Sequence, residues 1–267
     1  MVELLMVIAI IGMLMALIFP ALNSFRESGR RTQCLTQMKS VADAIDVYAN
    51  IQNEYPGWRN PPLKSGGPNA SWVVPLLTEF SRNDVYEEWR TSNSPAAPKI
   101  DLLICPTDTT KYREGMTNPM ISFVVNAGRP DRDPDTSAGE LFRDYRSNGL
   151  FLDRVREPDN KMTPAFVAKA DGKANVLMLS ENLDATRWNA TSGEEDSCML
   201  WRSSPSAIHH INGTGSGSGI DLARPSSGHE GGVNSVLANG SARFLNQDIN
   251  YNTYKDLLTV RSESVLP

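Results

Sequence analysis

The chain opens with an uninterrupted apolar segment. Residues 4–22 carry no polar side chain, and Glu3 is the charged residue that precedes them. At about 1.5 Å of rise per residue, a helix over this segment is about 28 Å long, which matches the hydrocarbon thickness of a bilayer. The apolar run of a soluble core helix is usually shorter, about 10 to 14 residues. The pattern therefore predicts a membrane-inserted helix over residues 1–22.

The helical pattern continues beyond this segment but becomes one-sided. Between Leu35 and Tyr48, apolar residues recur at steps of three and four. Pro20 lies within the predicted helix, and we expect it to kink the helix rather than end it, because helical patterns flank it on both sides. One long helix is therefore expected, with an amphipathic half over residues 23–50 whose apolar stripe packs on a sheet.

Residues 51–267 predict a globular α+β domain with a mainly antiparallel sheet. Short apolar runs bounded by turn-forming residues predict strands over 100–104, 121–125, 150–152 and 176–179. Short helices are expected over 71–80, 83–90 and 252–258.

A β-hairpin is predicted near the C-terminus, where Asn239-Gly240 separates two apolar runs. Asn-Gly is typical of a two-residue turn in which both residues have positive φ. Pairing about such a turn places Val233, Leu237, Ala242 and Phe244 on one face, which we expect to be the core side.

Composition and charge exclude several classes of protein. With 40% hydrophobic residues, 21% charged residues and a net charge of −5, the chain resembles an ordinary globular domain, and it has no basic field that would indicate nucleic-acid binding. Sequence motifs for a P-loop, a dinucleotide site or a nucleophile elbow are missing, so no enzyme class is indicated. The three cysteines lack C-x-x-C spacing, and either one disulfide with a spare thiol or three buried thiols fits them.

The histidines are the remaining candidates for metal chemistry. His209, His210 and His229 lie near Glu230, Asp221 and Cys198 in the sequence, but their spacing matches no zinc pattern. We therefore expect no metal or other cofactor, and we expect His229 to hold the glycine-rich loop through hydrogen bonds to backbone carbonyls near Asn250.

Three acidic residues could serve as calcium ligands or general acids. Asp108, Asp171 and Glu181 each follow or end a predicted strand or loop, but no Asp-x-Asp-x-Asp-Gly loop accompanies them. Capping of turns is the expected role.

The first residues resemble a known bacterial assembly segment. Residues 1–12 (MVELLMVIAIIG) are similar to the start of mature type IV pilins and type II secretion pseudopilins, and Pro20 matches the proline of their first helix. Met1 stands where that family has leucine, so processing by a prepilin peptidase is expected only if a full leader exists. The resemblance implies an inner-membrane anchor, a periplasmic or filament-borne domain, and pairing of Glu3 with the N-terminal amine of a neighbouring subunit. A carboxylate in an apolar span costs about 2.5 to 3.5 kcal/mol toward the helix centre, so it needs a partner.

Further motifs resemble a bacterial family with a prepilin-type N-terminal segment and a C-terminal His-x(9)-Asp-Gly motif. The matching segments are 30–35 (RRTQCL), 105–108 (CPTD), 179–182 (LSEN), the set His229, Gly231, Gly232 and Asn234, and the pair Asn239 and Gly240, where Asn replaces the usual Asp. The cysteines of the first two segments, Cys34 and Cys105, are expected to form a disulfide if the domain faces the periplasm, because the elements that carry them are expected to pack together.

The resemblance implies a non-enzymatic structural subunit of a pseudopilus or of a filament related to type IV pili, with other pilin-like subunits as partners. Two alternatives remain open. One is a membrane-tethered binding or adhesin domain that does not polymerise, and the other is a tethered metal-dependent hydrolase.

Overall fold

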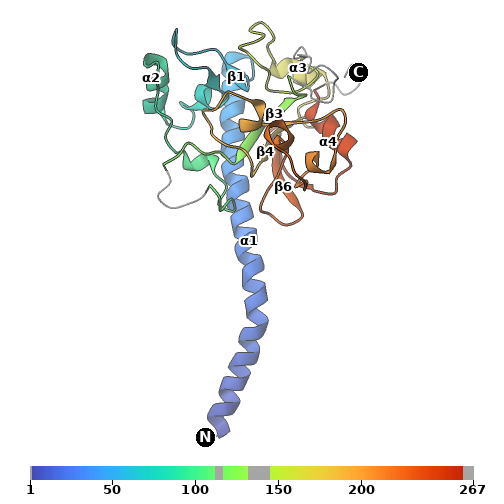
Figure 1. The fold of residues 1–267 in the computed structure, drawn as a ribbon. Coiled ribbons are helices and arrows are strands. Elements are labelled where there is room, and N and C mark those ends of the chain that lie inside the picture. Colours follow the sequence, from blue (N-terminus) through green and yellow to red (C-terminus); the bar gives the residue numbers. More distant parts are fainter. Residues whose placement is uncertain (1, 112–116, 132–144, 261–267) are drawn as a thin grey trace.

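The computed structural model describes residues 2–111, 117–131 and 145–260. Its longest element is the helix α1 (Val2–Gln52), which is continuous across both predicted halves and through position 20. In Figure 1 the N-terminal half of α1 projects from the globular body and curves away from it, whereas the C-terminal half lies along the body.

The C-terminal half of α1 is held by the apolar stripe that the sequence predicts. Met38, Val41, Ala42 and Ile45 are buried in the hydrophobic core, and Cys34 lies one turn before them on the same face. Because these residues recur every three or four positions, they form one face of the helix. The other face is mostly exposed, so this part of the helix is amphipathic.

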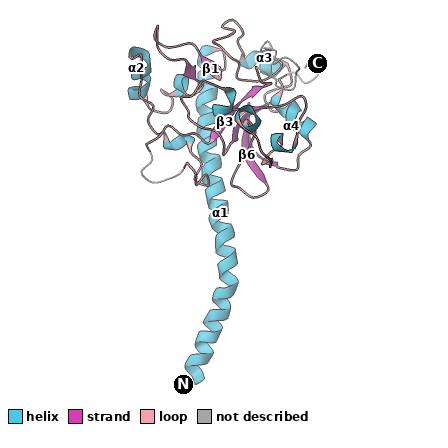
Figure 2. Cartoon of the chain, viewed as in Figure 1, coloured by secondary structure: helices cyan, strands magenta, loops and turns pink. Residues whose placement is uncertain are grey.

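In the described residues, five strands form a mainly antiparallel sheet in the order β5-β3-β4-β6-β7, in which the β3–β5 pair is parallel. Figure 2 shows the strands in magenta. A separate two-stranded sheet pairs β1 with β2. The strands are β1 (Arg59–Asn60), β2 (Ala70–Ser71), β3 (Phe123–Gly128), β4 (Leu177–Glu181), β5 (Cys198–Leu200), β6 (Gly232–Leu237) and β7 (Ala242–Asn246). The α+β class predicted from sequence is therefore confirmed.

Helices cover both faces of the large sheet. The helix α1 packs on β4 and β6, and α4 (Tyr251–Leu258) packs on β3 and β4. Glu181 of β4 bonds to Cys34 of α1, whereas Asn126 of β3 donates to the carbonyl of Leu258 in α4. Because helices cover both faces of the sheet, every residue of β3, β4 and β6 is buried. The remaining helices, α2 (Asn83–Thr91) and α3 (Pro164–Lys169), lie at the periphery (Figure 1).

Three predicted elements are wrong. The expected strand at 100–104 is a 3-10 turn over Asp101–Leu103 packed against α1. Residues 150–152 are buried but do not form a strand. The amides of Leu150 and Phe151 both donate to the carbonyl of Asn126, and both edges of β3 are already paired with β4 and β5. The expected helix at 71–80 contains only the 3-10 turn Val74–Leu76.

The C-terminal hairpin is present, but its turn differs from the predicted one. Gly240 has φ +77°, whereas Asn239 is not among the residues with positive φ. Val236 pairs with Ala242, and the amide of Leu237 donates to the carbonyl of Ser241, so the turn holds three residues rather than two. This one-residue difference reverses the faces of β7 relative to β6. Val233 therefore pairs with Leu245, and the predicted core face is wrong.

The face that carries Phe244 instead lies under α1. The ring of Phe244 sits opposite Asn234 in the β6–β7 ladder, and the guanidinium of Arg31 lies 3.6 Å from its centroid. A cation over an aromatic face is favourable. This contact fixes the end of the buried part of α1 against the hairpin.

Within the described residues, no helix combines the length and the apolar character needed to cross a membrane. Insertion of residues 1–22 into a membrane stays a prediction.

Candidate metal centre

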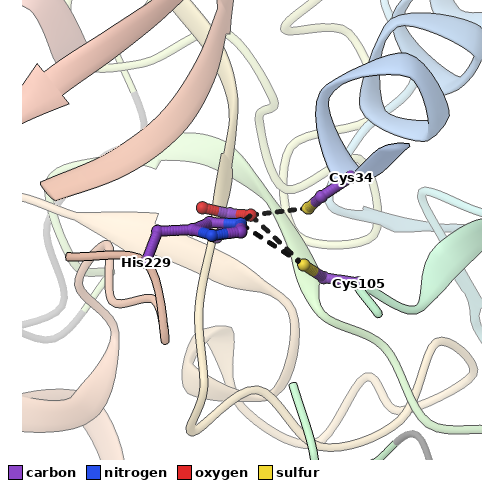
Figure 3. A group of neighbouring side chains, drawn as sticks. Cys34, Cys105 and His229 are labelled. Atoms are coloured by element: carbon purple, nitrogen blue, oxygen red, sulfur yellow. Dashed lines mark hydrogen bonds and ion pairs between the residues drawn. The ribbon is translucent and has the colours of Figure 1, made fainter. Parts of the chain in front are cut away.

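A cluster of four buried side chains joins α1 to the sheet. The ligand atoms of Cys34, Cys105, Glu181 and His229 all lie within 4.8 Å of one another. Figure 3 shows Cys34 reaching from α1 and Cys105 from a neighbouring loop toward the ring of His229. The four residues come from the four separate segments that carry the family resemblance in the sequence.

The helix α1 supplies one residue of the cluster, Cys34, and a hydrogen-bond partner of the cluster, Glu27. Glu27 and Cys34 are seven positions apart, so they lie two turns apart on one face of the helix. Cys34 is fully buried, whereas Glu27 lies at the rim, where Arg30 holds its Oε2 at 3.0 Å. Glu27 Oε1 accepts a hydrogen bond from His229 Nδ1 at 2.6 Å.

A tight turn positions Cys105. Its carbonyl accepts from the backbone amide of Asp108, and the Asp108 carboxylate accepts from Ser122 Oγ at 2.9 Å. The carboxylate also forms an ion pair with Lys111, and the Nζ of Lys111 donates to the carbonyl of Asn182. Asp108 therefore stabilises a turn, as the sequence predicts, and the turn fixes the loop that carries Cys105.

The segment that follows His229 explains the glycines and the asparagine of the C-terminal motif. Gly231 has φ +81°, a conformation that side chains disfavour. At Gly232, a Cβ atom would lie 2.0 Å from the carbonyl oxygen of Leu245, so only glycine permits pairing with β7. Asn234 then donates from its backbone amide to Glu181 Oε2 at 2.8 Å and from Nδ2 to Oε1 at 3.3 Å.

Glu181, the last residue of β4, is the common partner of the cluster. Its Oε1 accepts from Cys34 Sγ at 2.6 Å and lies 3.5 Å from Cys105 Sγ and 3.2 Å from His229 Nε2. The predicted turn-capping role of Glu181 is wrong, because its carboxylate points into the core between α1 and the sheet. Asp171 does lie in a turn, after α3, where its carbonyl accepts from Asn175.

The proximity of these groups shifts their pKa values. Burial lowers the pKa of His229, but hydrogen bonds to Cys105 and Glu181 and the charge of Glu181 outweigh it, so the pKa rises to about 10. The interaction with the neighbouring thiol of Cys34 lowers the pKa of Cys105 to about 7 against the effect of burial. Burial raises the pKa of Cys34. The two carboxylates, Glu27 and Glu181, therefore favour the protonated imidazolium form of His229 when no ion is bound.

The predicted disulfide between Cys34 and Cys105 is not formed in this structure. Both residues are free, buried thiols, as is Cys198. The prediction that their elements pack together agrees with the structure, but both sulfurs point at Glu181 Oε1 as a shared hydrogen-bond acceptor.

The predicted partners of His229 are also wrong. Its ring contacts carboxylates and a thiol rather than backbone carbonyls near Asn250. These partners come from α1, from the loop of Cys105 and from β4, which the pattern of the hairpin does not indicate.

The other histidines lie outside the cluster. His209 Nε2 is 3.3 Å from Asp221 Oδ1, and the His210 ring lies 5.1 Å from that of Tyr251. Cys198 is buried in β5. The residues that lie near the histidines in the sequence, Asp221 and Cys198, therefore do not form a metal site with His229.

The arrangement also resembles a nucleophile with its base. Cys105 Sγ lies 3.7 Å from His229 Nε2, and Glu27 orients the other ring nitrogen, which is the order of a thiol, base and acid triad. However, Cys105 is only 4% exposed, and the cavity that borders it and Glu181 holds about 10 Å³. Such a void admits about one water molecule. This geometry suits a buried centre better than attack on a substrate.

Sequence reasoning singled out Cys34, Cys105 and His229 but did not connect Glu27 and Glu181 with them. The seven-residue spacing of Glu27 and Cys34 was a usable signal, since it places both on one helix face. Nothing local indicates that Glu181 faces the same point.

The fold is thus an α+β domain on a protruding helix, with a buried cysteine, histidine and glutamate centre. The chain belongs to the family described as "Protein of unknown function (DUF1559)", whose model matches residues 23–252. All residues of the cluster lie within this match. No curated protein and no solved structure matches the chain.

Proposed function

We propose that this protein is a pilin-like structural subunit of a pseudopilus or secretion-related filament, anchored in the inner membrane by the N-terminal half of α1. The observation that carries the proposal is the surface of that projecting half. Leu4, Met6 and Met13 are 70%, 66% and 72% exposed, and Val7, Ile8, Ile10 and Ile11 are exposed as well.

The exposed apolar side chains lie on all sides of the helix rather than along one stripe. Met6, Val7 and Ile8 are consecutive and all exposed, and consecutive residues of a helix point about 100° apart. A helix that is apolar all round is stable only when something covers it on every side. Lipid in the membrane, and sister helices in a filament, would supply that cover.

Glu3 supports assembly rather than simple anchoring. It is exposed on the first turn of α1, where no described group of its own chain pairs with it. In the pilin-like resemblance, the N-terminal amine of a neighbouring subunit is the partner of this carboxylate. The globular domain would then lie in the periplasm or along the filament.

The test compares Glu3→Ala with the unchanged full-length chain, expressed with the assembly machinery of its bacterial host. We expect Glu3→Ala to remain in the membrane fraction but to lose incorporation into sheared filaments, because the variant removes the intersubunit partner while making the span more apolar. Fractionation and negative-stain imaging measure the two properties separately. Asp43→Ala, an exposed acidic position on the buried half of α1, is the matched control and should assemble normally.

Filaments that form equally well with Glu3→Ala would contradict the proposal. Membrane-bound protein that never forms filaments, even unchanged, would favour the tethered binding domain instead.

A further inference from the structure

We propose that Cys34, Cys105, Glu181 and His229 form a binding site for a divalent transition-metal ion of the zinc type. The ligands would be two thiolates, one carboxylate oxygen and the Nε2 of the imidazole. These atoms converge within 4.8 Å, and all four residues are buried. The site is independent of filament assembly, because it lies where α1 meets the sheet (Figure 3).

Three of the separations between the ligand atoms are close to those of tetrahedral coordination. Zinc bond lengths of about 2.0 to 2.3 Å place neighbouring donor atoms about 3.3 to 3.8 Å apart. Cys105 Sγ lies 3.5 Å from Glu181 Oε1 and 3.7 Å from His229 Nε2, and the last two atoms are 3.2 Å apart. The contact of Cys34 Sγ with Glu181 Oε1 is 2.6 Å and must open by about 1 Å.

Several hydrogen-bond donors share one acceptor atom in the cluster. Around Glu181 Oε1, potential donors lie at 2.6 Å (Cys34 Sγ), 3.5 Å (Cys105 Sγ), 3.2 Å (His229 Nε2) and 3.3 Å (Asn234 Nδ2). A carboxylate oxygen offers about two lone pairs, so these donors compete. Metal ligands bind in their deprotonated forms, and one ion in place of the thiol and imidazole protons removes the competition.

Glu27 orients the histidine ligand. Histidines that bind a metal through one ring nitrogen usually donate the other N–H to a carboxylate or carbonyl, which fixes the tautomer and the ring orientation. Glu27 Oε1 accepts from His229 Nδ1 at 2.6 Å, and Nε2 therefore faces the cluster. Glu27 is a positioning residue, and its own oxygen is not required as a ligand.

The donor set and the burial indicate which ion binds and what it does. Thiolates with an imidazole favour zinc over magnesium or calcium, which prefer oxygen. Four protein ligands leave no open position, and the adjoining cavity of about 10 Å³ has no room for a substrate. The ion would be structural and would fasten α1 to β4 and to the loops that carry Cys105 and His229.

The experiment uses the full chain, purified in detergent under reducing conditions and titrated with zinc alone. We expect about one zinc ion per chain by elemental analysis, and a cobalt-substituted protein should show the thiolate charge-transfer absorption of a tetrahedral site. Cys105→Ser should no longer retain the ion and should therefore lose the charge-transfer band, while Cys198→Ala, which removes a buried thiol away from the cluster, should keep both.

Glu27→Gln tests the site without removing a ligand. The variant should still bind zinc but with affinity lower by about 10- to 100-fold, the usual effect of changing the partner of a metal-binding histidine. Glu27 is partly exposed, so we expect Glu27→Gln to fold. This variant therefore still tests the site if a cysteine variant fails to fold.

Two results would overturn the proposal. One is reduced, folded, unchanged protein that takes up no stoichiometric zinc. The other is a Cys198→Ala variant that loses zinc as fully as Cys105→Ser, which would place the binding thiols elsewhere.

Discussion

At the scale of single residues, the pair Asp108 and Lys111 shows how the loop of the candidate metal centre is held. The ion pair spans 3.1 Å, and the side chains are only 2% and 3% exposed. Burial lowers the pKa of Lys111, and the nearby Asp108 opposes that shift. The Lys111 ammonium also donates to the carbonyl of Asn182. A charge in this position depends on its partner.

Replacing Asp108 by alanine should therefore be costly. Removing one member of a buried pair leaves the other charge uncompensated, and we expect Asp108→Ala to lower the free energy of unfolding by about 3 to 5 kcal/mol. Chemical denaturation followed by circular dichroism measures the change. Glu87→Ala breaks an exposed pair with Arg90 and should cost less than about 1 kcal/mol. Equal effects of the two variants would contradict the role assigned to burial.

At the scale of elements, the β6–β7 hairpin depends on glycine in two different ways. Gly240 is needed for its backbone conformation, since φ is +77° and a Cβ atom added there would have no atom within 4 Å. Gly232 is needed for space, because a Cβ atom there would meet the Leu245 carbonyl oxygen at 2.0 Å. The two positions should respond differently to the same substitution.

We expect Gly240→Ala to lower the free energy of unfolding by about 1 to 2 kcal/mol, the cost of a left-handed conformation. Gly232→Ala should cost more, about 3 kcal/mol, because strand β7 must move. As a control, Gly29→Ala in exposed α1 should stabilise the helix by up to about 1 kcal/mol. Thermal and chemical denaturation of the three variants check this order, and a smaller effect at Gly232 than at Gly240 would refute it.

At the scale of the whole molecule, the cluster links segments that are far apart in the chain. Cys34 lies on α1, Glu181 ends β4, and His229 precedes β6. A ligand bound among them stabilises only the folded arrangement, because the unfolded chain does not bring these segments together.

If the four residues bind zinc as proposed, a chelator should destabilise the entire domain. With free zinc at 100 times its dissociation constant, binding contributes about 2.7 kcal/mol, which corresponds to about 5 to 10 °C in unfolding temperature for a domain of this size. Calorimetry of the full chain with and without chelator measures the shift. Cys105→Ser should show no shift, and an equal shift in both proteins would mean that the chelator acts elsewhere.

Several features of this protein follow from sequence patterns alone. The length of α1, the burial of its second half and the positions of β3, β4, β6 and β7 all come from apolar periodicity, which depends only on neighbouring residues. The Asn239-Gly240 hairpin was likewise visible. The register of the hairpin could not be predicted, because the number of turn residues depends on whether Asn239 adopts positive φ. The same sequence is compatible with either conformation.

Only the tertiary structure decided how the chemistry is assembled. Cys34, Cys105 and His229 stood out in the sequence, yet the disulfide predicted for a periplasmic domain is not formed in this structure, and the predicted carbonyl partners of His229 were wrong. The contacts of these residues depend on strand order and on the docking of α1, which join residues distant along the chain. Local patterns carry no information about such distances, so Glu27 and Glu181 became recognisable as their partners only once the fold was known.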